Sequence, residues 1–185
     1  MEILKEISNN AIKELKDTCD KYPDLIHQES DVKCYLFYCI HKDLTEKGLS
    51  NDFAIHTETQ IEGYRDDSRK KAFCDLGVYK REDYNKNILN KPLIAFELKT
   101  SDAPRPKRAR RKNLHSVFMK QFNKTKSDYE RLSKIDIHLK YVIFVDLERI
   151  PKEWSNEREN YFKKELSHNC VNCYYIRCNK QEIQS

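Results

Sequence analysis

The chain has 185 residues, with 35 lysines and arginines against 30 acids and 38% hydrophobic residues, which suits one globular domain with a real core. Although 35% of its residues are charged, 11 tyrosines and 8 phenylalanines supply bulky apolar surface that disordered chains lack. Apolar stretches such as residues 141–145 are far shorter than the roughly 20 residues that cross a bilayer. These values exclude disordered and collagen-like classes and predict no membrane partner.

Residues 1–16 carry acids and lysines throughout and have no apolar signal core. We therefore expect an intracellular protein, cytoplasmic by default and nuclear only in a eukaryote. The seven cysteines agree with this expectation, because an odd number without the framing of a small secreted domain favours reduced thiols over a disulfide scaffold.

The excess positive charge lies in one segment. Residues 104–113, PRPKRARRKN, contain six basic residues and no acid, which leaves 29 basic and 30 acidic residues elsewhere. This basic segment can supply phosphate contacts to a nucleic acid, but a nuclear-import signal and a solvated loop have the same composition. Its candidate nucleic-acid contacts are Arg105, Lys107, Arg108, Arg110, Arg111 and Lys112.

The first half of the chain predicts two helices and three strands. Apolar residues at three- and four-residue spacings predict helices over residues 2–19 and from a cap at Ser30 or Asp31 to about Leu44, with Gly48 as a stop. Alternation with a period of two predicts strands over residues 52–61, 72–80 and 91–99, the first two paired as a hairpin. One face of the first strand should carry Phe53, Ile55, Thr57, Thr59 and Ile61. One face of the second should carry Cys74, Leu76 and Val78.

The second half predicts a helix over residues 114–135, a buried strand over 139–147, a helix over about 156–166 and a strand over about 171–178. The helix between the third and fourth strands should be the crossover of a βαβ unit, which makes those strands parallel. We therefore expect an α/β fold with a mixed sheet of about five strands. It forms a single domain over 1–185, with an N-terminal helix (1–22), a core (29–147) and a C-terminal helix and strand (150–185).

The chemistry is indicated by an acid in the second strand and an acid-x-lysine triplet in the third. Asp75 and Glu97 can converge, and Lys99 shares a face with Glu97. Two carboxylates on neighbouring strands suit Mg²⁺, and a metal with a nearby lysine suits phosphodiester hydrolysis. Two other such triplets, residues 14–16 and 31–33, fall in helical patterns.

Residues 29–147 resemble the PD-(D/E)XK nuclease superfamily in the motifs FCDLGVY and IAFELK, in the helix before them and in the helix and apolar strand after them. The resemblance implies a restriction-endonuclease-like fold and a Mg²⁺-dependent nuclease, with Mn²⁺ as a substitute and DNA favoured over RNA. Asp75, Glu97 and the Leu98 backbone carbonyl would bind the metal, and Lys99 would assist the attacking water. Cys74 stands where the motif has proline.

The resemblance also implies secondary site residues and partners. An acid from the preceding helix falls on Glu29, with Glu58 as a competitor, and a glutamine on the following helix falls on Gln121. A two-fold homodimer is the expected assembly if the enzyme cuts both strands of a duplex. A catalytically inactive nucleic-acid-binding module, an RNA endonuclease and a protein whose basic segment is only an import signal remain alternatives.

Other readings of individual residues stay open. Asp75 and Glu97 could form an ion-pair network with Lys99 or Arg69. His56 is expected at the surface rather than on a metal. The cysteines of the segment SHNCVNCYYIRC are expected to be structural thiols rather than a zinc site. Trp154, Tyr174 and Tyr175 are expected to pack rather than stack on bases.

Overall fold

Five helices and five strands make up the part of the chain that the computed structural model describes, residues 1–61, 73–86, 91–101, 111–147, 152–166 and 170–178. The helices are α1 (Glu2–Lys21), α2 (Glu29–Glu46), α3 (Arg81–Asn85), α4 (Arg111–Ser133) and α5 (Lys152–Glu165). The strands are β1 (Phe53–Gln60), β2 (Phe73–Lys80), β3 (Ile94–Thr100), β4 (Leu139–Asp146) and β5 (Asn172–Arg177). In these ranges, no helix offers an apolar stretch of the length needed to span a bilayer.

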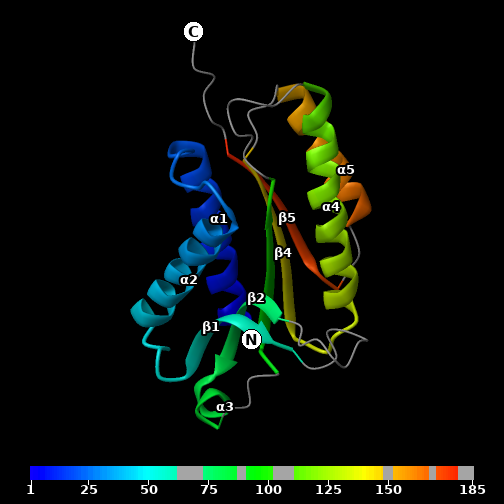
Figure 1. Cartoon of the computed structure of the whole chain (residues 1–185). Coiled ribbons are helices and arrows are strands. Elements are labelled where there is room, and N and C mark those ends of the chain that lie inside the picture. The colour runs from blue at the N-terminus through cyan, green and yellow to red at the C-terminus, as the bar shows by residue number, and fades with distance from the viewer. Residues whose placement is uncertain (62–72, 87–90, 102–110, 148–151, 167–169, 179–185) are drawn as a thin grey trace.

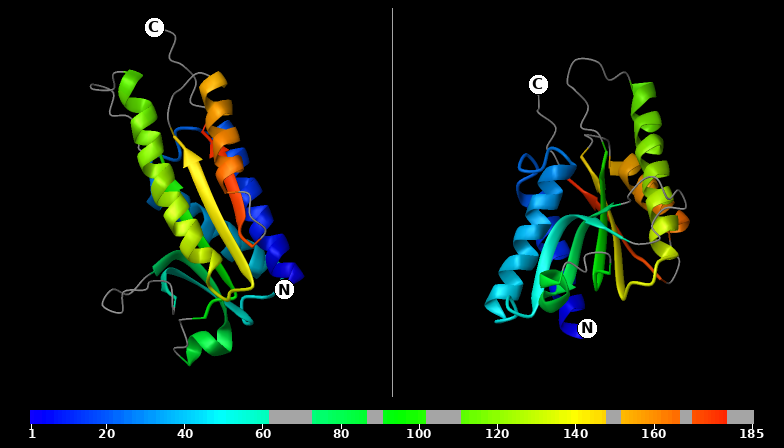
Figure 2. Two further views of the ribbon diagram at one scale, coloured as in Figure 1. Left: turned by 90° about the vertical axis from the view of Figure 1, so that its right-hand side faces the viewer. Right: turned by 60° about the horizontal axis from the view of Figure 1, so that its bottom comes forward.

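The strands form one mixed sheet in the order β1-β2-β3-β4-β5. β1, β2 and β3 pair antiparallel, and β3, β4 and β5 pair parallel. The predicted hairpin, the predicted parallel pair and the α/β class are therefore confirmed. Helices α1 and α2 cover one face of the sheet, and α4 and α5 cover the other (Figures 1 and 2). The short α3 was not predicted.

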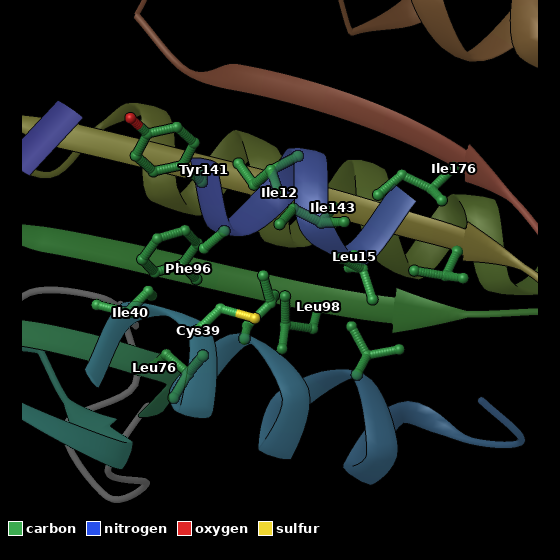
Figure 3. Close-up of a cluster of buried hydrophobic side chains, with 14 of the residues drawn as sticks. Ile12, Leu15, Cys39, Ile40, Leu76, Phe96, Leu98, Tyr141, Ile143 and Ile176 are labelled. Atoms are coloured by element: carbon green, nitrogen blue, oxygen red, sulfur yellow. The ribbon is translucent and has the colours of Figure 1, made fainter. Parts of the chain in front are cut away.

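Two apolar cores hold these layers together. Figure 3 shows the core between the sheet and helices α1 and α2. There Leu15 and Cys39 from the helices pack against Phe96, Leu98 and the neighbouring strand residues. The second core lies under α4 and α5 and is rich in aromatic rings. Burying each large apolar side chain contributes about 1.5–3 kcal/mol, so both faces of the sheet supply stability.

Helix α2 begins earlier than the predicted cap. Gln28 caps it, and the Asp31 carboxylate, in the third helical position, accepts hydrogen bonds from the backbone N–H groups of Gln28 and His27 at 3.1 and 2.9 Å. The Gln28 side chain and the Asp31 backbone N–H complete the reciprocal capping box that begins the helix. Gly48 ends the helix as predicted, with φ at +70°, a conformation that glycine adopts without a Cβ penalty.

Helix α4 also begins earlier than predicted, at Arg111 rather than residue 114. The last part of the basic segment is therefore helical, in agreement with the good helix propensity of arginine and lysine. Residues 111–113 thus belong both to the basic segment and to α4. The apolar pattern does not indicate this, because none of these three residues is apolar.

The regular alternation predicted for β1 and β2 breaks at Glu58 and Asp75. Glu58 has a φ of +53°, and the pairs on either side of it, Thr57 with Leu76 and Thr59 with Cys74, keep the register. The left-handed backbone reverses the alternation. Ile61 and Cys74 consequently join the core under α4 and α5, while Ile55, Leu76 and Val78 face α1 and α2. The prediction that each strand turns its apolar residues to one common face is therefore wrong for the residues after Glu58 and before Asp75. The Thr59 side chain likewise lies against Gly77, on the face of the sheet that α4 and α5 cover.

Candidate functional site

The site lies where β2 and β3 separate. The two strands pair only between residues 76–78 and 94–96, whereas β3 stays paired with β4 as far as Thr100. Beyond the last pair, the Asp75 carboxylate accepts a hydrogen bond from the Leu98 backbone N–H at 2.8 Å. This bond satisfies a buried backbone donor, and it holds Asp75 beside the end of β3.

Asp75 contacts two ammonium groups and is only 8% exposed. Lys33 Nζ of α2 lies 3.2 Å from Asp75 Oδ1, and Lys99 Nζ of β3 lies 3.9 Å from Oδ2. A buried carboxylate needs such partners, because moving an isolated charge from water into a protein interior is costly. Through Asp75 the site therefore joins α2, β2 and β3.

Lys99 is surrounded by acids from three elements. Besides Asp75, its ammonium group lies 3.6 Å from Glu29 Oε2 of α2 and 3.6 Å from Asp128 Oδ2 of α4. It also donates a hydrogen bond of 2.8 Å to the Leu98 carbonyl, the predicted metal ligand. The structure thus brings Glu29, Asp75 and Lys99 together, as the sequence predicted for the second helix and the two strands.

Glu97 is 4% exposed and lies on β3, two residues before Lys99. Continuing the β2–β3 register one step beyond Leu76 and Phe96 sets Glu97 level with Asp75. The pKa of the buried Cys74 thiol is raised, first by burial and then by the negative charges of Glu97 and Asp75. Both carboxylates therefore lie near one thiol. Their joint binding of a metal stays a prediction.

Glu58 reaches the site through Lys33. Its left-handed backbone turns it toward α2, where its carboxylate forms an ion pair with the Lys33 ammonium group. Of the two predicted auxiliary acids, Glu29 contacts Lys99, and the more exposed Glu58 contacts Lys33. Each acid is thus one ammonium group away from Asp75.

Glu29 differs electrostatically from an exposed acid at a helix start. Burial raises its pKa above the ordinary value of 4.5, and the Asp75 charge raises it further, while Lys99 and Lys33 lower it. The net shift is upward. A perturbed acid among several charged groups is typical of functional sites and also of structural ion-pair networks.

Sequence reasoning missed Lys33 and Asp128. Lys33 belongs to an acid-x-lysine triplet in a helix, and it lies four residues after Glu29 and so shares its helix face. Asp128 lies seven residues after Gln121, again on one helix face, and both are buried. The spacing was the available signal. No local pattern, however, indicates that these two faces meet the same strand ends.

The charges of this group do not balance. We call the group the β2–β3 site and count five carboxylates against three cations among the described side chains, a formal charge of −2. The carboxylates are Glu29, Glu58, Asp75, Glu97 and Asp128, and the cations are Lys33, Lys99 and Arg131, which pairs with Asp128.

Hard carboxylate oxygens fit a divalent cation such as Mg²⁺. Against this, the described residues contain no group of three or more His, Cys, Asp or Glu side chains arranged to hold a metal ion. Asp75 uses its oxygens for Lys33, Lys99 and the Leu98 N–H. The carboxylate oxygens therefore suit the metal. For a metal ion to bind, Asp75 has to exchange an ammonium partner for the ion.

The remaining candidates lie apart from this chemistry. His56 bonds through Nδ1 to the Thr57 carbonyl, and its ring lies 5.9 Å from that of Tyr84. All seven cysteines are free thiols. In the C-terminal segment Cys170 is exposed and Cys178 is buried, and burial raises the pKa of Cys173 to about 12.

The predicted nucleic-acid contacts are only partly described. Arg105, Lys107, Arg108 and Arg110 lie outside the described residues, and the side chains of Arg111 and Lys112 do too, although their backbone opens α4. Gln121 is buried in α4, so its side chain is not a surface contact. The basic segment nevertheless starts three residues after Ser101, which itself follows Lys99 by two.

Comparisons with known proteins found no relative. No protein-family model matches the chain, and neither the curated proteins nor the solved structures contain a match.

Proposed function

We propose that this protein is a Mg²⁺-dependent nuclease that hydrolyses phosphodiester bonds, with DNA as the favoured substrate. The observation that carries the proposal is the Lys99 ammonium group, which lies 3.6 Å from Glu29 and 3.9 Å from Asp75 and is two residues from the buried Glu97. Acids from a helix and two strands near one lysine supply oxygen donors and a cationic group that metal-assisted phosphodiester hydrolysis can use.

The residues have distinct roles in this proposal. Asp75 and Glu97 would hold the metal, with the Leu98 carbonyl and Glu29 as further oxygen donors. When bound, the ion supplies polarisation of the phosphoryl oxygen and a more acidic water. Lys99 donates hydrogen bonds to the attacking water or the phosphate and offsets the negative charge that develops in the transition state. Asp128 and Glu29 position the Lys99 ammonium group.

The finer fold assignment belongs to the same proposal. The order of α2, the three antiparallel strands, α4 and β4 is compatible with a restriction-endonuclease-like fold. The resemblance of the motifs around Asp75 and Glu97 to the PD-(D/E)XK superfamily supports this assignment.

The basic segment supplies the contacts to the substrate backbone. Arg105 lies six residues beyond Lys99, so chain length alone keeps it within about 22 Å. The six basic side chains of this segment can bind phosphates on either side of the bond that is cut. Binding through phosphates predicts an affinity that falls steeply with salt concentration.

The experiment is a cleavage assay with the purified chain, single- and double-stranded DNA and RNA, and Mg²⁺, Mn²⁺ or EDTA. Glu97→Ala should reduce the cleavage rate about 10²–10³-fold. Glu46→Gln, on the exposed far end of α2, should not change it. Cleavage that persists in EDTA or in Glu97→Ala rejects the proposed mechanism, and cleavage confined to RNA changes the substrate class.

A second candidate is a nucleic-acid-binding module without catalysis. The ion pairs of Asp75 with Lys33 and Lys99 favour it, because they neutralise the central carboxylate without a metal. This candidate predicts binding with a steep salt dependence and no cleavage with any divalent cation.

A further inference from the structure

A pocket of about 300 Å³ lies between α4 and α5, the two helices that run side by side over one face of the sheet (Figure 2). Three of its six lining residues are aromatic, and the walls also carry one acid and one arginine. The lining residues are Phe118, Met119, Trp154, Glu157, Arg158 and Tyr161.

Two rings of the pocket remain open to solvent. Trp154 is 39% exposed and Tyr161 is 38% exposed, although large aromatic side chains are usually well buried. The Tyr161 ring is held in place by Phe122, with 4.9 Å between ring centroids. Trp154, which the sequence predicted to pack, is thus only partly buried, and part of the residue is available to a ligand.

The polar side of the pocket consists of Arg158 and Glu157, which differ in their contacts. The Arg158 guanidinium lies 4.5 Å from the centre of the Phe118 ring and donates a hydrogen bond of 3.1 Å to the buried Asp146. Glu157 differs, since within the described residues no hydrogen bond or ion pair engages its carboxylate. The pocket thus offers flat apolar walls and a free acceptor.

The pocket is also connected to the β2–β3 site. Asp146, which holds Arg158, accepts a hydrogen bond of 2.7 Å from the Ser101 hydroxyl at the end of β3. Ser101 follows Lys99 by two residues. The other end of the basic segment enters α4 at Arg111, two helical turns before Phe118. Through Asp146, a hydrogen-bonded chain thus links Arg158 of the pocket to the end of β3.

We propose that the pocket binds one unpaired nucleobase of a nucleic-acid strand. The inference rests on the proposed nucleic-acid substrate and narrows it to strands with an unstacked base. A base is planar and can stack on Trp154 and Tyr161. The Glu157 carboxylate accepts hydrogen bonds from an exocyclic amino group, which favours cytosine, adenine or guanine over thymine. A base paired within a duplex has to leave the stack to enter.

Trp154 makes the test direct, because it is the only tryptophan in the chain. A single-stranded oligonucleotide of about 12 cytidines is titrated in EDTA, so that cleavage plays no part. We expect its binding to quench the Trp154 fluorescence. An abasic oligonucleotide with the same phosphates should bind more weakly and leave the fluorescence unchanged. Equal quenching by both, no quenching on binding, or no binding overturns the proposal.

Variants measure the contribution of stacking by the anisotropy of a labelled oligonucleotide. Trp154→Ala should weaken binding about tenfold, and Trp154→Phe should restore most of it. Tyr38→Ala, at an exposed tyrosine of α2, should bind normally. Glu157→Gln should reduce the preference for cytidine over thymidine. Normal binding by Trp154→Ala overturns the proposal.

The fluorescence test of the pocket and the cleavage test of the nuclease can give independent results. Base-dependent quenching without cleavage supports the pocket and refutes the nuclease. Cleavage without base-dependent quenching supports the nuclease and refutes the pocket. Because Glu97 does not line the pocket, Glu97→Ala should lose cleavage and keep the fluorescence response.

Discussion

Lys33 Nζ lies 3.2 Å from Asp75 Oδ1, so a lysine of α2 holds the carboxylate at the centre of the β2–β3 site. The same ammonium group pairs with Glu58, and the pKa of Lys33 is raised by these acids against the opposing effect of burial. A divalent cation that binds Asp75 competes with this lysine for the carboxylate oxygens.

Removing the competing charge should tighten metal binding. Lys33→Met keeps the apolar stem and removes the ammonium group, so we expect Mn²⁺ to bind about tenfold more tightly. Titration calorimetry measures the dissociation constant. The control is Lys42→Met, also on α2, which removes an ion pair with Glu14 of α1 and should leave the dissociation constant unchanged. Weaker Mn²⁺ binding by Lys33→Met would show that Lys33 supports the metal site instead.

Glu29 predicts a pH dependence. Its folded-state pKa lies above 4.5, chiefly because of burial. The protonated form therefore contributes stability that is complete below 4.5 and is lost as the pH rises through the folded-state pKa. Glu29→Gln, which stays neutral, should gain stability relative to the wild type over this rise. Thermal unfolding of both proteins from pH 4 to 8 checks this, and a difference that does not vary with pH contradicts it.

The position of Lys99 among three acids leads us to expect that Mg²⁺ stabilises a variant that lacks this lysine. Lys99→Met leaves Glu29, Asp75 and Asp128 without their shared cation, which should lower the free energy of unfolding by about 3 kcal/mol. Added Mg²⁺ should restore part of this loss, since a bound cation can replace the ammonium charge. The melting temperature with and without Mg²⁺ measures both effects. If Mg²⁺ stabilises the variant no more than the wild type, the acids do not share a metal.

Arg158 predicts a large loss of stability away from the site. Its ion pair with Asp146 is buried, with the side chains 6% and 1% exposed. Arg158→Met should cost about 3–5 kcal/mol, because a buried carboxylate loses its cation. Lys163→Met breaks the exposed pair with Glu159 and should cost less than about 0.5 kcal/mol. Urea unfolding distinguishes the two, and similar costs would contradict the burial argument.

Local patterns were enough to predict the element order. Helix and strand periods differ, and the apolar runs of this chain follow one or the other closely enough to indicate nine of the elements in order. The parallel pairing of β3 and β4 also follows from the sequence, since a helix of the length of α4 between two strands returns the chain to the same end of the sheet. Asp75 and Lys99 were recognised by the same means.

Longer-range features were not predictable. The face change at Glu58 depends on a left-handed backbone at a glutamate, which no residue preference indicates. The ion pairs of Lys33 with Asp75 and of Lys99 with Asp128 join elements that are distant in sequence. They form only because the packing of α2 and α4 brings these side chains to the end of β3.

The amino-acid sequence by itself determined the two periodicities, the acid-x-lysine triplet on a buried strand and the concentration of charge in residues 104–113, since each is a property of neighbours along the chain. Only the tertiary structure decided which acids surround Lys99, that Lys33 forms an ion pair with Asp75, and that Trp154 lines a pocket. The physical reason is that charge neutralisation and burial depend on distances between helices and strands, and those distances are set by how the apolar faces pack.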